Sequence, residues 1–367
     1  MTAPAPSSAP SFAQSVWLVT EREIGSKLRS KAFLISTGIL FAIALVAVVW
    51  GGFAAQSDSR IPVAVTADTA GAVSSIEDAL EITEASDAGA ARELVRSGEV
   101  DAALVPGGGD PFGFTVVADD APPSTLMQLL SVTPPVELLT TDGVDWALRY
   151  FVSLGFGLIF FMAALTFGST IAQSVVEEKQ TRVVELLISA IPTRALLAGK
   201  VIGNTILAMG QIIGLAAIAI VGLTVTDQSA LLTGLGAPLV WFAVFFLFGF
   251  ILLAALFAAA AAMVSRQEDI GSTTTPLTFL VMAPYFLVIF FNDNPVVLTI
   301  MSYVPFSAPV GMPVRVFLGE AQWWEPLLSL VILLATCVAA IAIGARIYEN
   351  SLLRMGARVK LAEALKA

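Results

Sequence analysis

Residues 239–265 read LVWFAVFFLFGFILLAALFAAAAAMVS and contain no Asp, Glu, Lys or Arg. A helix that spans the hydrocarbon core of a membrane needs about 20 predominantly apolar residues. A helix of this stretch would be apolar on every side, whereas a surface helix of a soluble protein carries a polar face. The stretch therefore predicts a membrane-spanning helix and indicates an α-helical membrane protein.

Six such segments occur along the 367 residues, each built on an uncharged apolar run. The composition agrees, because 57% of the residues are hydrophobic and 13% are charged, against about 45–50% and about 25% in soluble domains. The fourth span is predicted to begin after the glycine- and proline-containing segment 234–238, since these residues interrupt helices. The predicted spans are 32–57, 147–176, 201–226, 239–265, 270–292 and 326–347.

A further uncharged run, 294–314, contains Pro295, Pro305, Pro309 and Pro313. Repeated proline removes backbone N–H donors, and lipid offers no replacement partners. We therefore expect short interfacial or re-entrant helices within an external segment, 293–325. A seventh crossing is the alternative.

The distribution of Lys and Arg predicts the orientation, because cytoplasmic loops carry an excess of these residues. The loop between the third and fourth spans has none, and 293–325 has only Arg315. Six spans with both termini in the cytoplasm place every basic cluster on one side of the cell membrane. The predicted cytoplasmic segments are 1–31, which includes an interfacial helix over 11–31, the loop 177–200, and the tail 348–367.

The segment 58–146, between the first two spans, differs in composition from the rest. Residues 55–146 hold 16 Asp and Glu against 3 Arg, a net charge of −13. Short apolar runs predict strands at 61–66, 101–106 and 114–118, with helices at 71–80 and 88–97 between them. We expect a small extracytoplasmic α/β domain. The chain offers no sizeable basic surface for nucleic acid.

Several kinds of catalytic site are excluded by missing residues. The chain has no His and a single Cys, Cys337, so catalytic triads that need His, HExxH zinc sites, CxxC redox motifs and intrachain disulfides are ruled out. No GxxxxGK[ST] motif occurs, so the chain has no P-loop for ATP. We expect no cofactor or metal site in this chain.

The loop 177–200 reads EEKQTRVVELLISAIPTRALLAGK. It predicts an amphipathic helix over 178–191 that Pro192 ends. Such a helix is either a connector on the lipid surface or a helix offered to a cytoplasmic partner. The polar face would carry Glu178, Arg182, Glu185 and Ser189, and the apolar face Val183, Val184, Leu187 and Ile191.

Polar residues inside the predicted spans are few: Gln173, Asn204 and Gln211. Polar groups are costly in lipid, so these side chains predict hydrogen bonds between helices in preference to substrate contact. Two glycine pairs, Gly199 with Gly203 and Gly210 with Gly214, permit close helix approach.

Several segments carry a family resemblance. The pattern Glu-Glu-Lys-x-x-Arg-x-x-Glu-x-Leu over 177–187, followed by Gly199-Lys200, resembles the first cytoplasmic loop of ABC-2-type ABC transporter permeases. The likeness is closest to the NatB-like sodium-efflux branch. Similar segments follow in the family's order: Glu21 with 29–33, 97–105, 265–269 with Pro276, and 305–315.

The resemblance implies the permease subunit of an ABC exporter, which is a transport subunit and not itself an enzyme. It also implies a dimer with a second permease copy or homologue, surrounded by membrane lipid, and a separate ATPase subunit that binds ATP and Mg²⁺. An ion-gradient-driven secondary transporter and a membrane-anchored sensor are the alternatives. The substrate (sodium, a drug, a peptide or a lipid) stays open. The expected ATPase-coupling residues are Glu178, Arg182, Glu185, Leu187, Ile191, Arg266 and Glu268.

Overall fold

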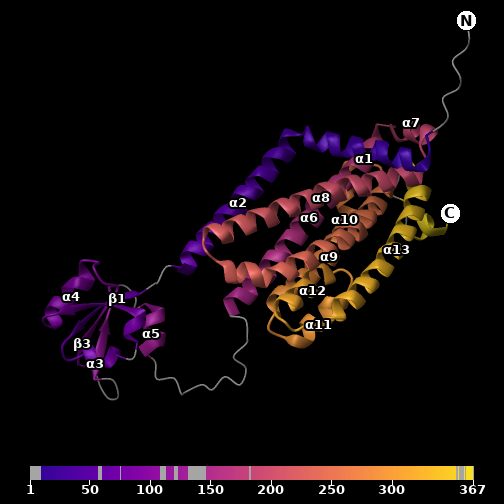
Figure 1. The fold of residues 1–367 in the computed structure, drawn as a ribbon. Helices are drawn as coiled ribbons and strands as arrows, with labels where there is room; N and C mark the ends of the chain where they lie inside the picture. Colours follow the sequence, from indigo (N-terminus) through magenta and orange to yellow (C-terminus); the bar gives the residue numbers. More distant parts are fainter. Residues whose placement is uncertain are drawn as a thin grey trace, which may run out of the picture. The chain divides into compact units, whose positions relative to one another are not determined.

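The computed structural model divides the chain into two compact units (Figure 1). A helical unit comprises residues 1–52 and 142–367, and an α/β unit comprises residues 53–141. The structure describes residues 10–56, 60–74, 76–107, 113–119, 123–130, 146–181, 183–352, 354, 359 and 361–366.

Six helices of the described residues are long and apolar enough to cross a membrane, which confirms the predicted fold class. They are α2 (Lys31–Gln56), α6 (Trp146–Gln180), α8 (Thr193–Val225), α9 (Ser229–Ala262), α10 (Ile270–Phe290) and α13 (Glu325–Leu352). The helices α6, α8 and α9 have 35, 33 and 34 residues. At about 1.5 Å per residue each is about 50 Å long, which exceeds the roughly 30 Å of hydrocarbon. Their ends therefore extend beyond the apolar layer.

The predicted start of the fourth span is wrong. The helix α9 begins at Ser229 and continues through Pro238. A proline costs a helix one backbone hydrogen bond, but an apolar environment offers the backbone no better conformation than the helix. The glycines and proline of 234–238 therefore do not interrupt it.

Five shorter helices lie in the described part of the helical unit. The segment 294–314 contains two of them with a turn between, in place of one long helix. The Asn294 side chain accepts hydrogen bonds from the backbone N–H groups of Val296 and Val297, so it caps the first. The short helices are α1 (Phe12–Leu28), α7 (Val183–Ala190), α11 (Pro295–Tyr303), α12 (Ala308–Phe317) and α14 (Leu361–Lys366).

The helix α9 lies at the centre of the helical unit, where it contacts α6, α8, α12 and α13. Aromatic rings fill its contact with α6. Phe156 stacks on Phe242 with ring centroids 4.7 Å apart, and the Phe160 and Phe246 rings meet edge to face at 5.7 Å. Lipid is as apolar as these rings, so helix association in a membrane depends on such close packing more than on the hydrophobic effect.

The α/β unit contains a four-stranded sheet in the order β2-β1-β3-β4. The strands β2 and β3 both pair parallel with β1, and β4 pairs antiparallel with β3. The predicted strands and the helix at 88–97 are confirmed. The elements are β1 (Ile61–Thr66), α3 (Ala70–Val73), the 3₁₀ turn η1 (Glu77–Ala79), β2 (Leu80–Ala85), α4 (Ala88–Arg96), β3 (Ala102–Pro106), β4 (Phe114–Val117) and α5 (Ser124–Leu130).

The helix predicted at 71–80 is wrong. This segment contains the short α3 and the turn η1, and it leads into β2, which sequence reasoning missed. β2 is an edge strand whose residues Glu81 and Glu84 are exposed. A strand with solvent on one side needs no continuous apolar run, so that signal was absent.

Candidate functional site

One end of the helical unit gathers the residues that the sequence singled out, and we call it the α7 end. Here α6 ends, α7 follows, and α8 begins, with α1 packed along α8 (Figure 1). The C-terminal ends of α9 and α13 lie at the same end, because both contact Lys179 of α6.

Lys179 is fully buried and joins three helices. Its Nζ donates hydrogen bonds to the carbonyl oxygens of Ala262, 2.8 Å away, and Ser351, 2.9 Å away. These carbonyls belong to the last turns of α9 and α13, where backbone acceptors lack helical partners and the helix dipole favours a cation. Lys179 thus fixes the end of α6, just before α7, against two other helices.

The glycine pair Gly199 and Gly203 brings α1 onto α8. A Cβ at Gly203 would lie 2.9 Å from the Glu23 Cβ, and a Cβ at Gly199 would collide with Val19. The Thr20 hydroxyl donates a hydrogen bond to the Gly199 carbonyl at 3.3 Å. The glycines therefore permit the close helix approach that their spacing suggests, and the partner is the short helix α1.

A buried group of charges lies at this contact. Lys200 is fully buried, and its Nζ lies 2.9 Å from Glu23 Oε1, 3.0 Å from Glu178 Oε1 and 2.6 Å from Ser174 Oγ. Arg22 pairs with both carboxylates. We call these five residues the α1–α8 cluster.

The α1–α8 cluster contains two carboxylates and two cations, so its formal charges balance. Burial raises the pKa of Glu23, but Lys200 and Arg22 together lower it further, so the net pKa lies below its ordinary value. Buried charges are tolerated when each is paired. Among the described residues, no three acidic, Cys or His side chains gather as a metal site would require.

Glu178 therefore does not lie on the docking face that the sequence predicted. The predicted helix 178–191 is wrong at its start, because α6 continues to Gln180 and α7 begins only at Val183. Glu178 belongs to α6, and its side chain is 12% exposed within the α1–α8 cluster. The spacing could not reveal this, because its partner Arg22 lies on α1, 156 positions away in the sequence.

The apolar face predicted for the loop is also oriented differently. Leu187 and Ile191 are half-buried and pack against the core of the helical unit. Leu186 is instead 73% exposed and Val183 37% exposed. Glu185 and Ser189 are exposed as predicted for the polar face. Arg182 lies outside the described residues.

Arg266 and Glu268 lie at the same end, directly after α9. Their side chains are about 70% exposed and pair at 3.2 Å around the 3₁₀ turn η2 (Gln267–Asp269). The structure thus brings this pair to the α7 end together with Glu185.

The three polar residues of the predicted spans have different surroundings. Asn204 is buried, and its Nδ2 donates to the Lys200 carbonyl at 2.9 Å, which keeps the bond within α8. Gln173 is exposed and Gln211 half-buried on the surface of the helical unit. They do not form one polar group along a pathway.

A second buried charge group lies at the other end of the helical unit, and sequence reasoning missed it. Arg315 Nη2 lies 2.9 Å from Glu325 Oε2, its Nη1 donates to Ser302 Oγ at 3.0 Å, and the Tyr303 hydroxyl donates to Glu325 Oε1 at 2.9 Å. We call these four residues the α12–α13 cluster. In the sequence, Arg315 stood out only as the single basic residue of 293–325.

Comparison with known proteins gives a family and two relatives. The model of the ABC-2 family transporter protein matches residues 31–346. The uncharacterized protein YhaP of Bacillus subtilis is 30% identical over 210 residues, which cover 54% of this chain and 50% of that protein. The uncharacterized protein MJ1024 of Methanocaldococcus jannaschii is 23% identical over 221 residues, covering 60% and 54% respectively. The chain spans about half the length of the curated relatives it matches.

Proposed function

The chain belongs to the ABC-2 transporter family, and on that premise we propose that it is the permease subunit of an ABC exporter driven by a separate ATPase subunit. The observation that carries this proposal is the exposed apolar face of α7. Val183 and Leu186 lie on a helix of 8 residues between two long apolar helices, exposed at the end of the unit.

This face suits a protein partner. A short helix that offers large apolar side chains and a polar rim is a common element of helix-in-groove recognition. We propose that Leu186 and Val183 enter a groove of the ATPase, with Glu185 and Ser189 at the rim. Charged rim groups set the register of a complex more than its affinity. The exposed pair of Arg266 and Glu268 is a second contact at the same end.

The contacts that hold α7 and its neighbouring helices in place support a role in coupling the ATPase to the permease. Val184 is buried and Leu187 is half-buried, so the inner face of α7 packs on the helical unit. The preceding helix α6 is held to α9 and α13 by Lys179, and the following helix α8 is held to α1 by Lys200. A movement of the ATPase against α7 would thus be passed to these five helices together.

The remaining assignments follow from the basic flanks and from the resemblance. We propose that the α7 end and both termini face the cytoplasm of the cell, that the α/β unit is extracytoplasmic, and that the permease works as a dimer. Transport is outward. The NatB-like likeness makes sodium the first substrate to test, followed by drugs, peptides and lipids.

The test begins with the ATPase itself. Tagged permease is purified from cross-linked host membranes, the co-purifying chain that carries a P-loop is identified, and the two are expressed together. We expect Val183→Asp with Leu186→Asp to abolish the complex. Each buried apolar side chain contributes about 1.5–3 kcal/mol, so the affinity should fall at least roughly 100-fold.

A matched control comes from the same protein. Leu361 is 54% exposed on the short helix α14, and Leu361→Asp should leave the yield of ATPase unchanged. If the doubly substituted α7 still retains the ATPase at the wild-type yield, α7 is only a connector. Transport in vesicles that hold an ion gradient but no ATPase would favour a secondary transporter.

A further inference from the structure

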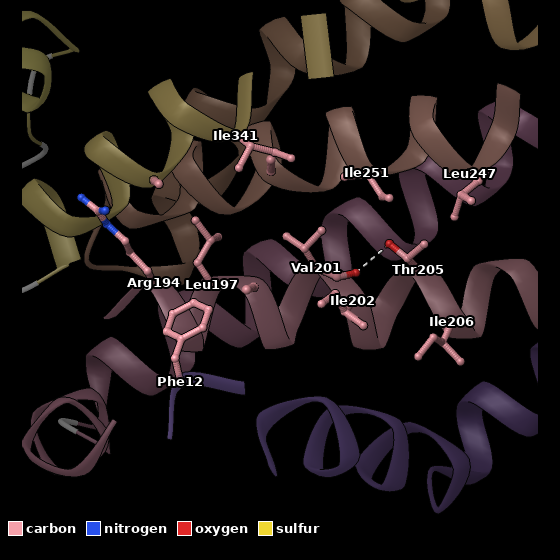
Figure 2. Close-up of a pocket in the computed structure, with 13 residues that line it drawn as sticks. Phe12, Arg194, Leu197, Val201, Ile202, Thr205, Ile206, Leu247, Ile251 and Ile341 are labelled. Carbon is pink, nitrogen blue, oxygen red and sulfur yellow. Dashed lines mark hydrogen bonds between the residues drawn. The ribbon is translucent and has the colours of Figure 1, made fainter. Parts of the chain in front are cut away.

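A cavity of about 500 Å³ lies between α8, α9 and α13. Figure 2 shows Arg194 and Phe12 at one end of it and Leu247 and Ile206 towards the other. Apart from Arg194 and Thr205, every lining residue is apolar. The Thr205 hydroxyl donates to the Val201 carbonyl at 2.7 Å, so its proton is already engaged within α8 (Figure 2).

The lining fits a hydrocarbon chain. Water in a cavity needs two to four polar partners, and this lining supplies almost none. Alanines from each of the three helices, Ala198, Ala255 and Ala345, leave the space that larger side chains would fill. The volume lies within the range of about 300–1,000 Å³ for pockets that hold small molecules. The three helices are candidate membrane spans, so the acyl chains of lipid surround the opening.

The charges at the Arg194 end fit an anion. Arg194 is 70% exposed and donates from Nε and Nη2 to the Glu349 carboxylate, at 2.7 and 3.3 Å. A guanidinium has five N–H donors, so three stay available. Arg346 is exposed one helical turn before Glu349, and it makes no ion pair within the described part of the chain. Two cations against one carboxylate leave a net positive charge beside an apolar cavity.

We propose that this groove binds one anionic phospholipid, with an acyl chain in the cavity and the phosphate against Arg194 and Arg346. Guanidinium groups bind phosphate oxygens through paired hydrogen bonds. Arg194 follows the start of α8 by one residue, at the end of a helix longer than the hydrocarbon is thick. That position is the level at which a lipid headgroup lies. The lipid is a resident of the permease and needs no ATPase.

The test uses the full chain reconstituted in nanodiscs of phosphatidylethanolamine and phosphatidylglycerol and then released into mild detergent. Native mass spectrometry counts the lipids that stay bound. We expect one phosphatidylglycerol per chain. Arg194→Gln with Arg346→Gln should lower the retention of phosphatidylglycerol on the order of tenfold. Each cation beside an anionic headgroup adds an electrostatic attraction, and the double variant loses both.

Filling the cavity separates this site from other lipid contacts. Ala198→Phe with Ala345→Phe should remove the bound lipid, and Ile341→Trp, a single change at a 40% exposed position, should do the same if the double variant does not fold. Val338→Trp is the control, because Val338 lies on α13 outside the cavity and is 67% exposed.

Three results would overturn the proposal. The first is wild-type lipid retention in either filled variant. The second is loss of a dimer mass in the filled variants with no lipid in the wild type, which would assign the groove to a second copy. The third is a rise in bound lipid when residues 1–9 are deleted, which would make that segment the occupant. None of these results depends on the ATPase, so the proposed function stands or falls separately.

Discussion

The two ends of the helical unit each bury a salt bridge, but they assemble it from different distances along the chain. The α1–α8 cluster joins residues 22–23, 174–178 and 200, from three separate helices. The α12–α13 cluster joins residues 302–325. The first is a long-range connection between elements, and the second closes a local fold of two short helices against α13.

The two clusters also differ in whether backbone groups or side chains bind their charged residues. In the α12–α13 cluster, Arg315 also donates to the Glu320 carbonyl at 3.1 Å, and the Gln322 backbone N–H donates to Glu325 at 2.7 Å. In the α1–α8 cluster the charges meet only side chains among the described residues. Side chains can exchange partners, whereas backbone groups are fixed. The difference indicates a fixed charge cluster at α12–α13 and an adjustable one at the contact between α1 and α8.

The largest effect is expected from Lys200→Met, which removes the cation that pairs with both carboxylates of the α1–α8 cluster. Two buried carboxylates would then share Arg22 alone, and removing one partner of a buried pair costs about 3–5 kcal/mol. We expect the free energy of unfolding in detergent to fall by that amount, and α1 to become sensitive to protease. Adding Glu178→Gln should recover part of the loss. Wild-type stability of Lys200→Met would show that α1 is held by its packing on Gly199 and Gly203.

A smaller effect is expected from Arg315→Met, because Glu325 would retain hydrogen bonds from Tyr303 and Gln322. The loss should lie near the lower limit for a buried pair, about 3 kcal/mol. The same unfolding measurement checks it, with Glu325→Gln added as the compensating change. Protease sensitivity of α1 should stay at the wild-type level. A loss larger than that of Lys200→Met would reverse the ranking of the two clusters.

The smallest effect is the dependence on pH, and it can be followed through one titrating group at each end. The pKa of Glu23 lies below its ordinary 4.5, so its contribution to stability is present above pH 4.5 and is lost as the pH falls through the lower folded value. Burial, and then the hydrogen bond to Glu325, raise the pKa of Tyr303 above 10.0, so its contribution is present below pH 10 and is lost at higher pH.

Protease cleavage within α1 and within the α11–α12 turn measures the two ends separately. We expect acid to expose α1, and alkali to expose the α11–α12 turn before α1. Glu23→Gln should remove the acid response, and Tyr303→Phe the alkaline one. Simultaneous exposure of both segments at one pH would mean that the helical unit unfolds as a whole.

The sequence was informative where local composition decides the structure. Uncharged apolar runs predicted six spans because lipid requires every backbone group to be paired inside a helix. Short apolar runs predicted β1, β3 and β4, whose side chains are buried or half-buried except for Pro106 and Thr115. The edge strand β2 was missed because its exposed side chains carry no such signal.

The site was predicted less well, because side-chain direction depends on neighbours far away in the chain. Spacing alone made Leu187 and Ile191 the docking face and left Leu186 unnoticed. The choice was made by the core of the helical unit, which covers one side of α7 and leaves the other exposed. The sequence placed Glu178 and Lys179 in a cytoplasmic loop. In the structure α6 continues to Gln180, so both residues belong to that helix.

By itself, then, the sequence determined the number of spans, the α/β unit between the first two, and the absence of a P-loop. Each depends on composition over a window of residues, which no tertiary contact can alter. Only the tertiary structure decided that Lys200 meets Glu23, that Lys179 caps α9 and α13, and that Leu186 faces outward. A buried charge must find its partner in space, and the close approach of α1 to α8 at Gly199 and Gly203 provides it.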